Sequence, residues 1–318
     1  MKLGVLTAAL GNLAFEEMLD RVADLGLDAI ELHVAVTQHI PTEELLKSKT
    51  TRTQWAAAIE RRGLIISSLS AHGNPVHPDP AVAKADDAML RKAIRLAEKL
   101  GLHRVNGFSG CPGDQHGARV PNWVTCPWPP DFLELVAWQW EKKVIPYWTK
   151  AAKFAADHGV KIGFEMHPGF VVYNPETLLR LRAACGKNLG ANFDPSHLFW
   201  QGMDPIEAVR ALKGAIWHVH AKDCRVDPVN ARVNGVLDTK HYGDELDRSW
   251  IFRTVGYGHG EGFWRDFVSI LRLCGYDHVL SIEHEDSLMT IDEGITKAAE
   301  FLKGILIRDP KPKGMHWA

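Results

Sequence analysis

The chain has 318 residues, of which 46% are hydrophobic and 24% are charged, and its formal net charge at pH 7 is −2. This is the composition of an ordinary globular protein, long enough for one large α/β domain or two smaller ones. The near-neutral charge argues against nucleic-acid or anionic-membrane partners, and no apolar run reaches the roughly 20 residues that span a bilayer. The five cysteines show no CxxC spacing, which favours free thiols in a reducing cytoplasm.

Short apolar runs alternate with longer helical patterns along the whole chain. Eight strands are predicted, at residues 2–7, 29–33, 64–70, 103–110, 161–167, 188–194, 215–220 and 278–285. Helices are predicted at residues 15–26, 53–63, 81–101, 138–159, 175–186, 204–214, 262–276 and 291–307, with a kink near Pro146 in the fourth.

Eight strand and helix units in one domain are typical of a (β/α)₈ TIM barrel, which we predict for residues 1–318. A doubly wound open sheet is the alternative. It is less favoured because the turn after the first strand, LTAALGNLAF, lacks the GxGxxG pattern of a phosphate-binding turn.

Two connections are too long to be simple linkers, at about residues 109–135 and 222–262. They follow the fourth and seventh strands, so both are expected on the catalytic face of the barrel as lids or binding loops, or as part of an oligomer interface. Trp123 and Trp128 in the first connection offer stacking surface for a sugar or aglycone. Trp138, Trp140 and Trp148 have helical spacing, which favours packing.

Ionisable residues stand where four successive strands end. They are Glu165 in GFEMHP, Asp194 in ANFDPSH, His220 in WHVHAKD and Glu283 in SIEHED. A single residue of this kind can have a purely local role, as when an aspartate caps the next helix. Four in the same phase converge on one pocket, and three carboxylates with one imidazole suit a single divalent cation. Mn²⁺ is favoured, with Mg²⁺, Co²⁺ or Zn²⁺ as alternatives.

The segments FEMH, NFDPSHL, HVHAKD, GYGHGEGFW and SIEHED resemble the sugar-phosphate isomerase/epimerase family of xylose-isomerase-like TIM barrels. The resemblance covers nearly the whole chain. It implies the metal ligands named above, and it implies that Glu165 and Glu283 also act as acid and base on opposite sides of the substrate. It further implies that His197, in DPSH, and the segment after HAKD contact the substrate.

The first long connection indicates a resemblance to a smaller group within this family. SGCPGD, PNW and PWPPDF, followed by WQWEKKVIPYW, are similar to the alpha subunits of C-glycoside deglycosidases and related enzymes of 3-oxo-glycosides. This likeness implies a small-molecule sugar or glycoside as substrate. It also implies a small beta subunit or a homo-oligomer as a partner.

The epimerase, lyase and hydratase activities considered for this chain share one step, the removal of a proton from the carbon next to a carbonyl. Return of the proton to the opposite face gives epimerisation, whereas loss of the substituent one carbon further gives elimination. A 3-oxo group makes the C1 substituent of a glycoside such a leaving group. The sequence therefore predicts a 3-oxo-glycoside lyase or hydratase, with a ketose 3-epimerase or sugar isomerase as the alternative.

His167 is the predicted general acid or base, because it follows Glu165 by two residues on the same strand face. A second option is that it only orients Glu165.

Five further side chains are predicted to bind the sugar. Glu31 and His72 follow the second and third strands, Asp223 and Arg225 begin the second long connection, and His259 lies in GYGHGEG. Asp223 and Arg225 have the alternative of pairing with each other, and strand-end histidines often bond only to the backbone.

Two other functional classes remain as competitors. A metal-dependent apurinic endonuclease shares this barrel, but it needs a basic DNA groove, which a net charge of −2 does not favour. A subunit of a C-glycoside deglycosidase that is inactive without its partner is the third interpretation.

Overall fold

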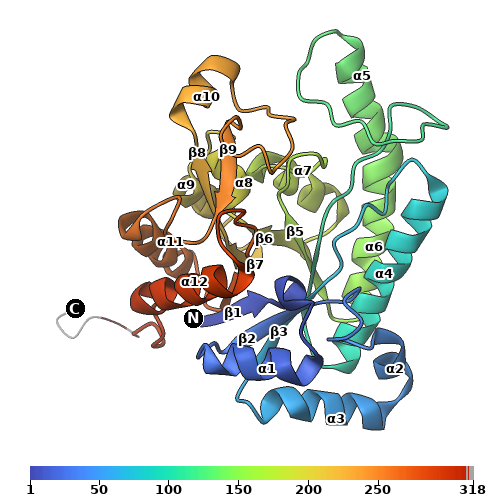
Figure 1. The fold of residues 1–318 in the computed structure, drawn as a ribbon. Coiled ribbons are helices and arrows are strands. Elements are labelled where there is room, and N and C mark those ends of the chain that lie inside the picture. Colours follow the sequence, from blue (N-terminus) through green and yellow to red (C-terminus); the bar gives the residue numbers. More distant parts are fainter. Residues whose placement is uncertain (313, 315–318) are drawn as a thin grey trace.

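The predicted strands form a closed barrel in the computed structural model, which describes residues 1–312 and 314 (Figure 1). All eight strands pair in parallel, in the order β1-β10-β7-β6-β5-β4-β3-β2, so the predicted TIM barrel is confirmed. Their bounds are Lys2–Leu6 (β1), Ala29–His33 (β2), Ile65–Ser70 (β3), Arg104–Gly107 (β4), Lys161–Glu165 (β5), Leu189–Phe193 (β6), Ile216–Ala221 (β7) and Val279–Ile282 (β10).

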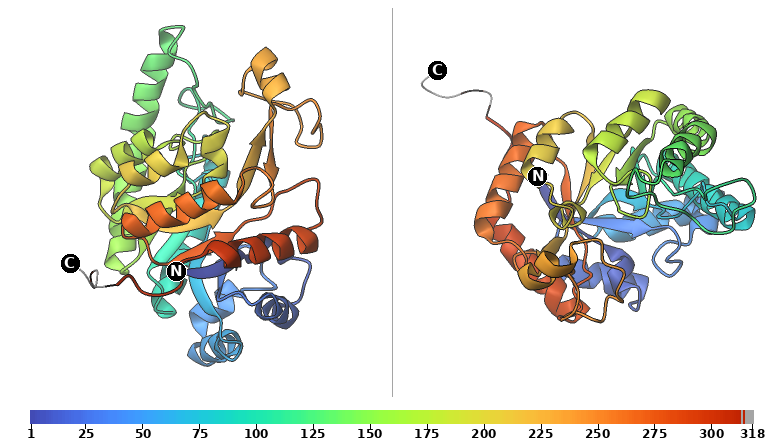
Figure 2. Two further views of the ribbon diagram at one scale, coloured as in Figure 1. Left: turned by 90° about the vertical axis from the view of Figure 1, so that its left-hand side faces the viewer. Right: turned by 90° about the horizontal axis from the view of Figure 1, so that it is seen from above.

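Helices cover the outside of the barrel (Figures 1 and 2). The main ones are Phe15–Asp24 (α1), Lys49–Glu60 (α3), Pro80–Lys99 (α4), Ile145–Asp157 (α6), Pro175–Cys185 (α7), Pro205–Ala211 (α9), Glu261–Leu273 (α11) and Ile291–Ile305 (α12). Shorter elements are Thr7–Leu10 (η1), Thr42–Lys47 (α2), Asp131–Trp138 (α5) and Ser196–Phe199 (α8). Within the described residues, no helix is both long and apolar enough to cross a membrane.

Several helices begin at a proline preceded by a side chain that caps the first turn. Asp79, Asn174 and Asp204 accept backbone N–H groups at the start of α4, α7 and α9. Proline at the first helical position loses no hydrogen bond, because that N–H has no partner inside the helix.

The fourth predicted helix is divided as the position of Pro146 suggests. The π-helical turn Gln139–Val144 (η2) separates α5 from α6. Proline has no N–H to donate and its ring crowds the preceding turn of an α-helix. A wider π-helical turn immediately before Pro146 accommodates the ring.

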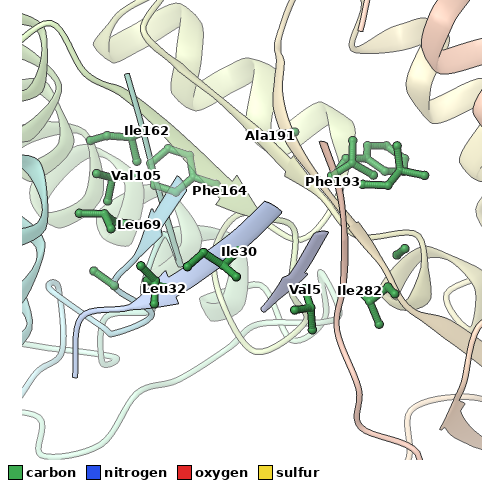
Figure 3. Close-up of a cluster of buried hydrophobic side chains, with 14 of the residues drawn as sticks. Val5, Ile30, Leu32, Leu69, Val105, Ile162, Phe164, Ala191, Phe193 and Ile282 are labelled. Carbon is green, nitrogen blue, oxygen red and sulfur yellow. The ribbon is translucent and has the colours of Figure 1, made fainter. Parts of the chain in front are cut away.

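The main hydrophobic core lies between the strands and the helices. Val5, Ile30, Leu32, Phe164 and Ile282 belong to it, as Figure 3 shows, and all are at most 1% exposed. Because side chains alternate along a strand, the residues between them face the inside of the barrel.

The inside of the barrel is polar. Asn106 on β4 donates to Glu31 on β2, and His220 on β7 lies 2.9 Å from Glu31 across the barrel. A register shift in the β2–β3 pairing leaves Ser67 as an extra residue, and its hydroxyl lies 3.2 Å from a ring nitrogen of His218.

The two long connections project from the same end of the barrel (Figure 2). The first leads from β4 into α5. The second, which we expected to be a loop, contains a two-stranded antiparallel sheet, Asp223–Val226 (β8) and Trp250–Arg253 (β9), with the helix Pro228–Asn234 (α10) between them. Sequence patterns missed this sheet because both strands are only four residues long.

Trp148 in α6 gives a test of this packing. It is 1% exposed, its indole N–H donates to the Ser109 carbonyl, and its ring meets Phe164 edge-on at 4.6 Å between centroids. We predict that Trp148→Ala lowers the free energy of unfolding by about 3–5 kcal/mol, measured by urea denaturation. Leu133→Ala on the exposed face of α5 is the control and should change it by less than about 0.5 kcal/mol. Equal losses in the two variants would contradict the packing role.

Candidate metal centre

The four predicted metal ligands meet at one end of the barrel. Glu165 ends β5, Asp194 follows β6, His220 lies in β7 and Glu283 follows β10. One ligand atom from each lies within 4.8 Å of those of the other three. Parallel strands of a barrel all end on the same face. Residues at the same position in four strand ends therefore lie close together with ordinary strand geometry.

His197, at the start of α8, binds two of these carboxylates. Its Nε2 lies 2.9 Å from Glu165 Oε1 and 3.3 Å from Asp194 Oδ2. His220 lies between the two glutamates, with Nδ1 at 2.9 Å from Glu283 Oε2 and 3.4 Å from Glu165 Oε2. The cluster is therefore compact, and only Glu283 has appreciable exposure, 13% of its side chain.

Lys222 also lies inside the cluster, although it was not among the predicted residues. Its Nζ is 3.1 Å from Asp194, 2.9 Å from Glu283 and 3.1 Å from Glu285. Burial opposes its charge, but these carboxylates raise the pKa of Lys222 well above its usual value. His218, His220 and Lys222 alternate along the chain, and this continuing phase was the signal that could have found it.

Two carboxyl groups of the cluster, those of Glu165 and Glu283, have lowered pKa values. Burial opposes ionisation of Glu165, yet the neighbouring His197, His220 and His72 and the Lys222 ammonium hold its pKa well below its usual value. Burial likewise opposes the charge on Glu283, but Lys222 and His220 lower its pKa to about 2.

A divalent cation fits these residues. Asp194 Oδ2 and Glu283 Oε2 are buried, and neither has a hydrogen-bond donor in good geometry among the described residues. Both oxygens lie against the Lys222 ammonium, which offsets part of their charge, and each carboxylate oxygen has a further lone pair that a cation can use. Carboxylate oxygens and an imidazole nitrogen are suitable ligands for Mn²⁺, Mg²⁺, Co²⁺ or Zn²⁺.

Glu31 supports His220 from below. Its Oε2 lies 2.9 Å from His220 Nε2, and its Oε1 accepts a hydrogen bond from Asn106 at 2.8 Å. Burial opposes a charge on His220, but Glu31 and Glu283 raise the pKa of His220 well above its usual value. A cation bound at Nδ1 would replace the proton there, and Glu31 would keep the other proton on Nε2. Glu31 was predicted to contact the sugar, but it is fully buried inside the barrel, where its two oxygens are already engaged.

His218 occupies a deeper layer of the barrel than His220. Its ring nitrogens lie 2.9 Å from Asn192 Oδ1 and 3.2 Å from Ser67 Oγ. Burial lowers the pKa of His218 to about 3, so the ring is neutral and serves as support.

His167 and His72 lie beside the cluster. The His167 ring is 4.1 Å from the His197 ring, and His72 Nε2 is 3.4 Å from Glu165 Oε2. Burial, and then the proximity of His197, lower the pKa of His167 to about 3. Its Nδ1 faces the Pro168 carbonyl, which only accepts, so Nδ1 carries the proton and Nε2 keeps a free lone pair.

Asp223 organises a loop. Its carboxylate accepts the backbone N–H groups of Gly256, Gly258 and His259, and its Oδ1 lies 2.8 Å from His259 Nδ1. These bonds leave it no free oxygen for the predicted contact with a sugar. Arg225 is exposed and makes no ion pair within the described residues, so the two do not form the alternative pair.

His259 is half-buried and lies flat against Phe199, with 3.7 Å between the ring centroids. The structure thus brings His72, His167 and His197 to the cluster, whereas Asp223 and His259 lie together under the loop after β9.

A cavity of about 400 Å³ adjoins the cluster. It is lined by His167, Tyr242, Ile251, Phe252, Glu285 and Ser287. Tyr242, Ile251 and Phe252 come from the second long connection, so its predicted place at the catalytic face agrees with the structure.

Comparisons with known proteins identify the family of the chain. Residues 19–305 match the family described as "Xylose isomerase-like TIM barrel". The uncharacterized protein YfiH of Bacillus subtilis (strain 168) is 40% identical over 309 residues, which cover 95% of this chain and 98% of that protein. An inosose dehydratase of Clostridium botulinum (strain Alaska E43 / Type E3) is 35% identical over 90 residues, 28% of this chain and 30% of that enzyme.

Solved structures share the fold. A D-tagatose 3-epimerase-like protein has a TM-score of 0.63 at 23% identity, covering 96% of this chain and 98% of that one. The probable 3-DHS dehydratase AsbF from Bacillus anthracis has a TM-score of 0.64 at 16% identity, covering 95% and 99%. The IOLI protein, with a bound zinc atom, has a TM-score of 0.64 at 19% identity, covering 96% and 98%. From the match over residues 19–305 and the full-length relative, the chain belongs to the xylose isomerase-like TIM barrel family.

Proposed function

We propose that the protein is a divalent-metal-dependent enzyme that enolises a 3-oxo-glycoside and eliminates its C1 substituent. The observation that carries the proposal is the cluster of Glu165, Asp194, His220 and Glu283 beside the neutral His167 and an open cavity. The similarity to enzymes named inosose dehydratase and 3-DHS dehydratase supports an elimination, because a dehydratase expels a group as water.

Mn²⁺ is the proposed ion. A divalent cation held by these four residues would polarise a substrate oxygen beside the carbon that loses its proton. Three carboxylates favour a hard cation, and the zinc in the IOLI protein supports a divalent ion at such a site.

The residues around the cluster have distinct proposed roles. His167 Nε2, with its free lone pair, takes the C2 proton. Lys222 and His197 hold the carboxylates in place through their ion pairs with Asp194 and Glu165. Glu283 has more side-chain exposure than Glu165, Asp194 or His220, so we propose that it exchanges the second proton.

In the proposed elimination, the C2 proton passes to His167, and the C2–H electron pair first forms the enolate with the 3-oxo group. The pair then forms the C1–C2 double bond as the C1 bond to the substituent breaks. The substituent leaves with that bond pair and takes up a proton, and water can add at C1 of the resulting enone to give the hydrated 3-oxo-sugar.

A ketose 3-epimerase is the second candidate. The likeness to a D-tagatose 3-epimerase-like protein favours it, and so does the presence of two glutamates, Glu165 and Glu283, in one cluster. The two candidates share proton abstraction and differ only in the fate of the neighbouring bond.

Incubation in D₂O separates the two. We expect the metal-loaded protein to exchange deuterium at C2 of a 3-oxo-glucoside with release of the aglycone, measured by NMR. Exchange in a free ketose with an intact carbon skeleton would indicate the epimerase instead. Absence of exchange with both would refute enolisation, and turnover by the isolated chain would remove the need for a beta subunit.

Glu165→Gln tests the metal centre. The amide removes one negative charge and one ligand, so we expect loss of Mn²⁺ binding and of turnover together. Calorimetric titration with Mn²⁺ measures the first and aglycone release the second, with circular dichroism as the control for folding. Full activity of metal-stripped wild-type protein would contradict the proposal.

Glu31→Gln tests the support of His220. We expect Mn²⁺ affinity to fall by about 10- to 100-fold, because the carboxylate no longer holds the proton on Nε2. Glu134→Gln, an exposed change on α5, is the matched control and should leave affinity unchanged. Equal affinities in Glu31→Gln and wild type would show that Glu31 has no such role.

A further inference from the structure

The cavity beside the metal centre has one aromatic wall. Phe252 on β9 links the two, since its ring lies 4.7 Å from Lys222 Nζ and 5.4 Å from the His197 ring. Tyr242 extends the wall outward, with its ring 5.9 Å from that of Phe252 and inclined by 20°. The two rings therefore form one wall between the cavity and the predicted metal ligands.

The aromatic wall packs against the buried Arg248. Arg248 is 2% exposed, and its guanidinium lies 4.5 Å from the Tyr242 ring and 4.6 Å from the Trp250 ring. It donates to the carbonyls of Trp250 and Lys240, and no carboxylate pairs with it within the described residues. Trp250 in turn stacks on Trp200 at 4.6 Å. Tyr242 is 53% exposed, and its contact with Arg248 favours one orientation of the ring before a ligand arrives, which would reduce the entropy lost on binding.

The other lining residues restrict what fits. Tyr242, Ile251 and Phe252 offer mainly apolar surface, so sugar hydroxyls would find few partners there. Glu285 also lines the cavity; it pairs with Lys222, but its carboxylate can only accept hydrogen bonds and disfavours anions such as phosphate or carboxylate. A volume of about 400 Å³ is at the lower end for small-molecule sites, enough for one ring system beyond the group at the metal.

We propose that Tyr242 and Phe252 form a subsite for a neutral, planar aromatic substituent at C1 of the keto-sugar. This inference rests on the proposed function, since the sugar must lie with its oxygens at the metal centre. The aromatic aglycone then stacks on the two rings and is shed toward the cavity mouth. A sugar phosphate is disfavoured as substrate.

The experiment compares aryl with alkyl substrates. We expect Tyr242→Ala to raise KM for p-nitrophenyl 3-oxo-β-D-glucoside by about 5- to 10-fold, the size of one aromatic contact, and KM for the methyl 3-oxo-glucoside by less than about twofold. Phe252→Leu, which keeps an apolar side chain in the barrel mouth, should act in the same direction. Leu246→Ala, on the same insertion and 93% exposed, is the matched control and should change neither value.

A binding measurement keeps this inference separate from the proposed reaction. Calorimetry with unoxidised p-nitrophenyl β-D-glucoside, which cannot be eliminated, should show weaker binding in Tyr242→Ala than in wild type. If neither oxo-glucoside loses its substituent but this difference persists, the proposed reaction fails and the subsite stands. If Tyr242→Ala, folded by circular dichroism, changes aryl and methyl glucosides equally or changes neither, the subsite is refuted.

Discussion

The central constraint on this structure is the burial of several carboxylates together at the mouth of the barrel. Four carboxylates stand around His220 and Lys222, namely those of Glu31, Glu165, Asp194 and Glu283. Such a group of charges is costly to bury, so it can exist only where other interactions stabilise the chain. The continuous apolar layer between strands and helices supplies that stability, and it leaves the inside of the barrel free for polar side chains.

Much of the fold, and the meeting of the four residues predicted as metal ligands, could be predicted from the sequence, because both follow from the alternation of side chains along a strand. In β5, Ile162 and Phe164 pack outward while Glu165 faces the mouth, and the same phase carries Asp194 and Glu283 into one place. Parallel strands in a barrel end together, so local alternation is enough to predict this meeting. Lys222 follows the same alternation, but the predicted strand stops at His220 and so does not include it.

The remaining parts depend on contacts between distant segments. Aromatic packing across an insertion of some thirty residues produces the β8–β9 sheet, the position of Tyr242 and the burial of Arg248. Such packing leaves no periodic pattern in the sequence. Asp223 illustrates the same point. Its place after the HAK triplet suggested a sugar contact, whereas the loop that returns more than thirty residues later takes up both of its oxygens.

This clamp gives the insertion the properties of a cassette. Asp223 lies at its first strand and Gly258 just beyond its last, and a Cβ at position 258 would lie only 2.4 Å from Asp223 Oδ1, so the two ends are pinned against each other. Segments between pinned ends can change in length at little entropic cost. Replacement of residues 227–253 would therefore change the lining of the cavity and leave the cluster of Glu165, Asp194, His220 and Glu283 unchanged. A barrel of this kind can in this way accept a different substrate without a change in its strands.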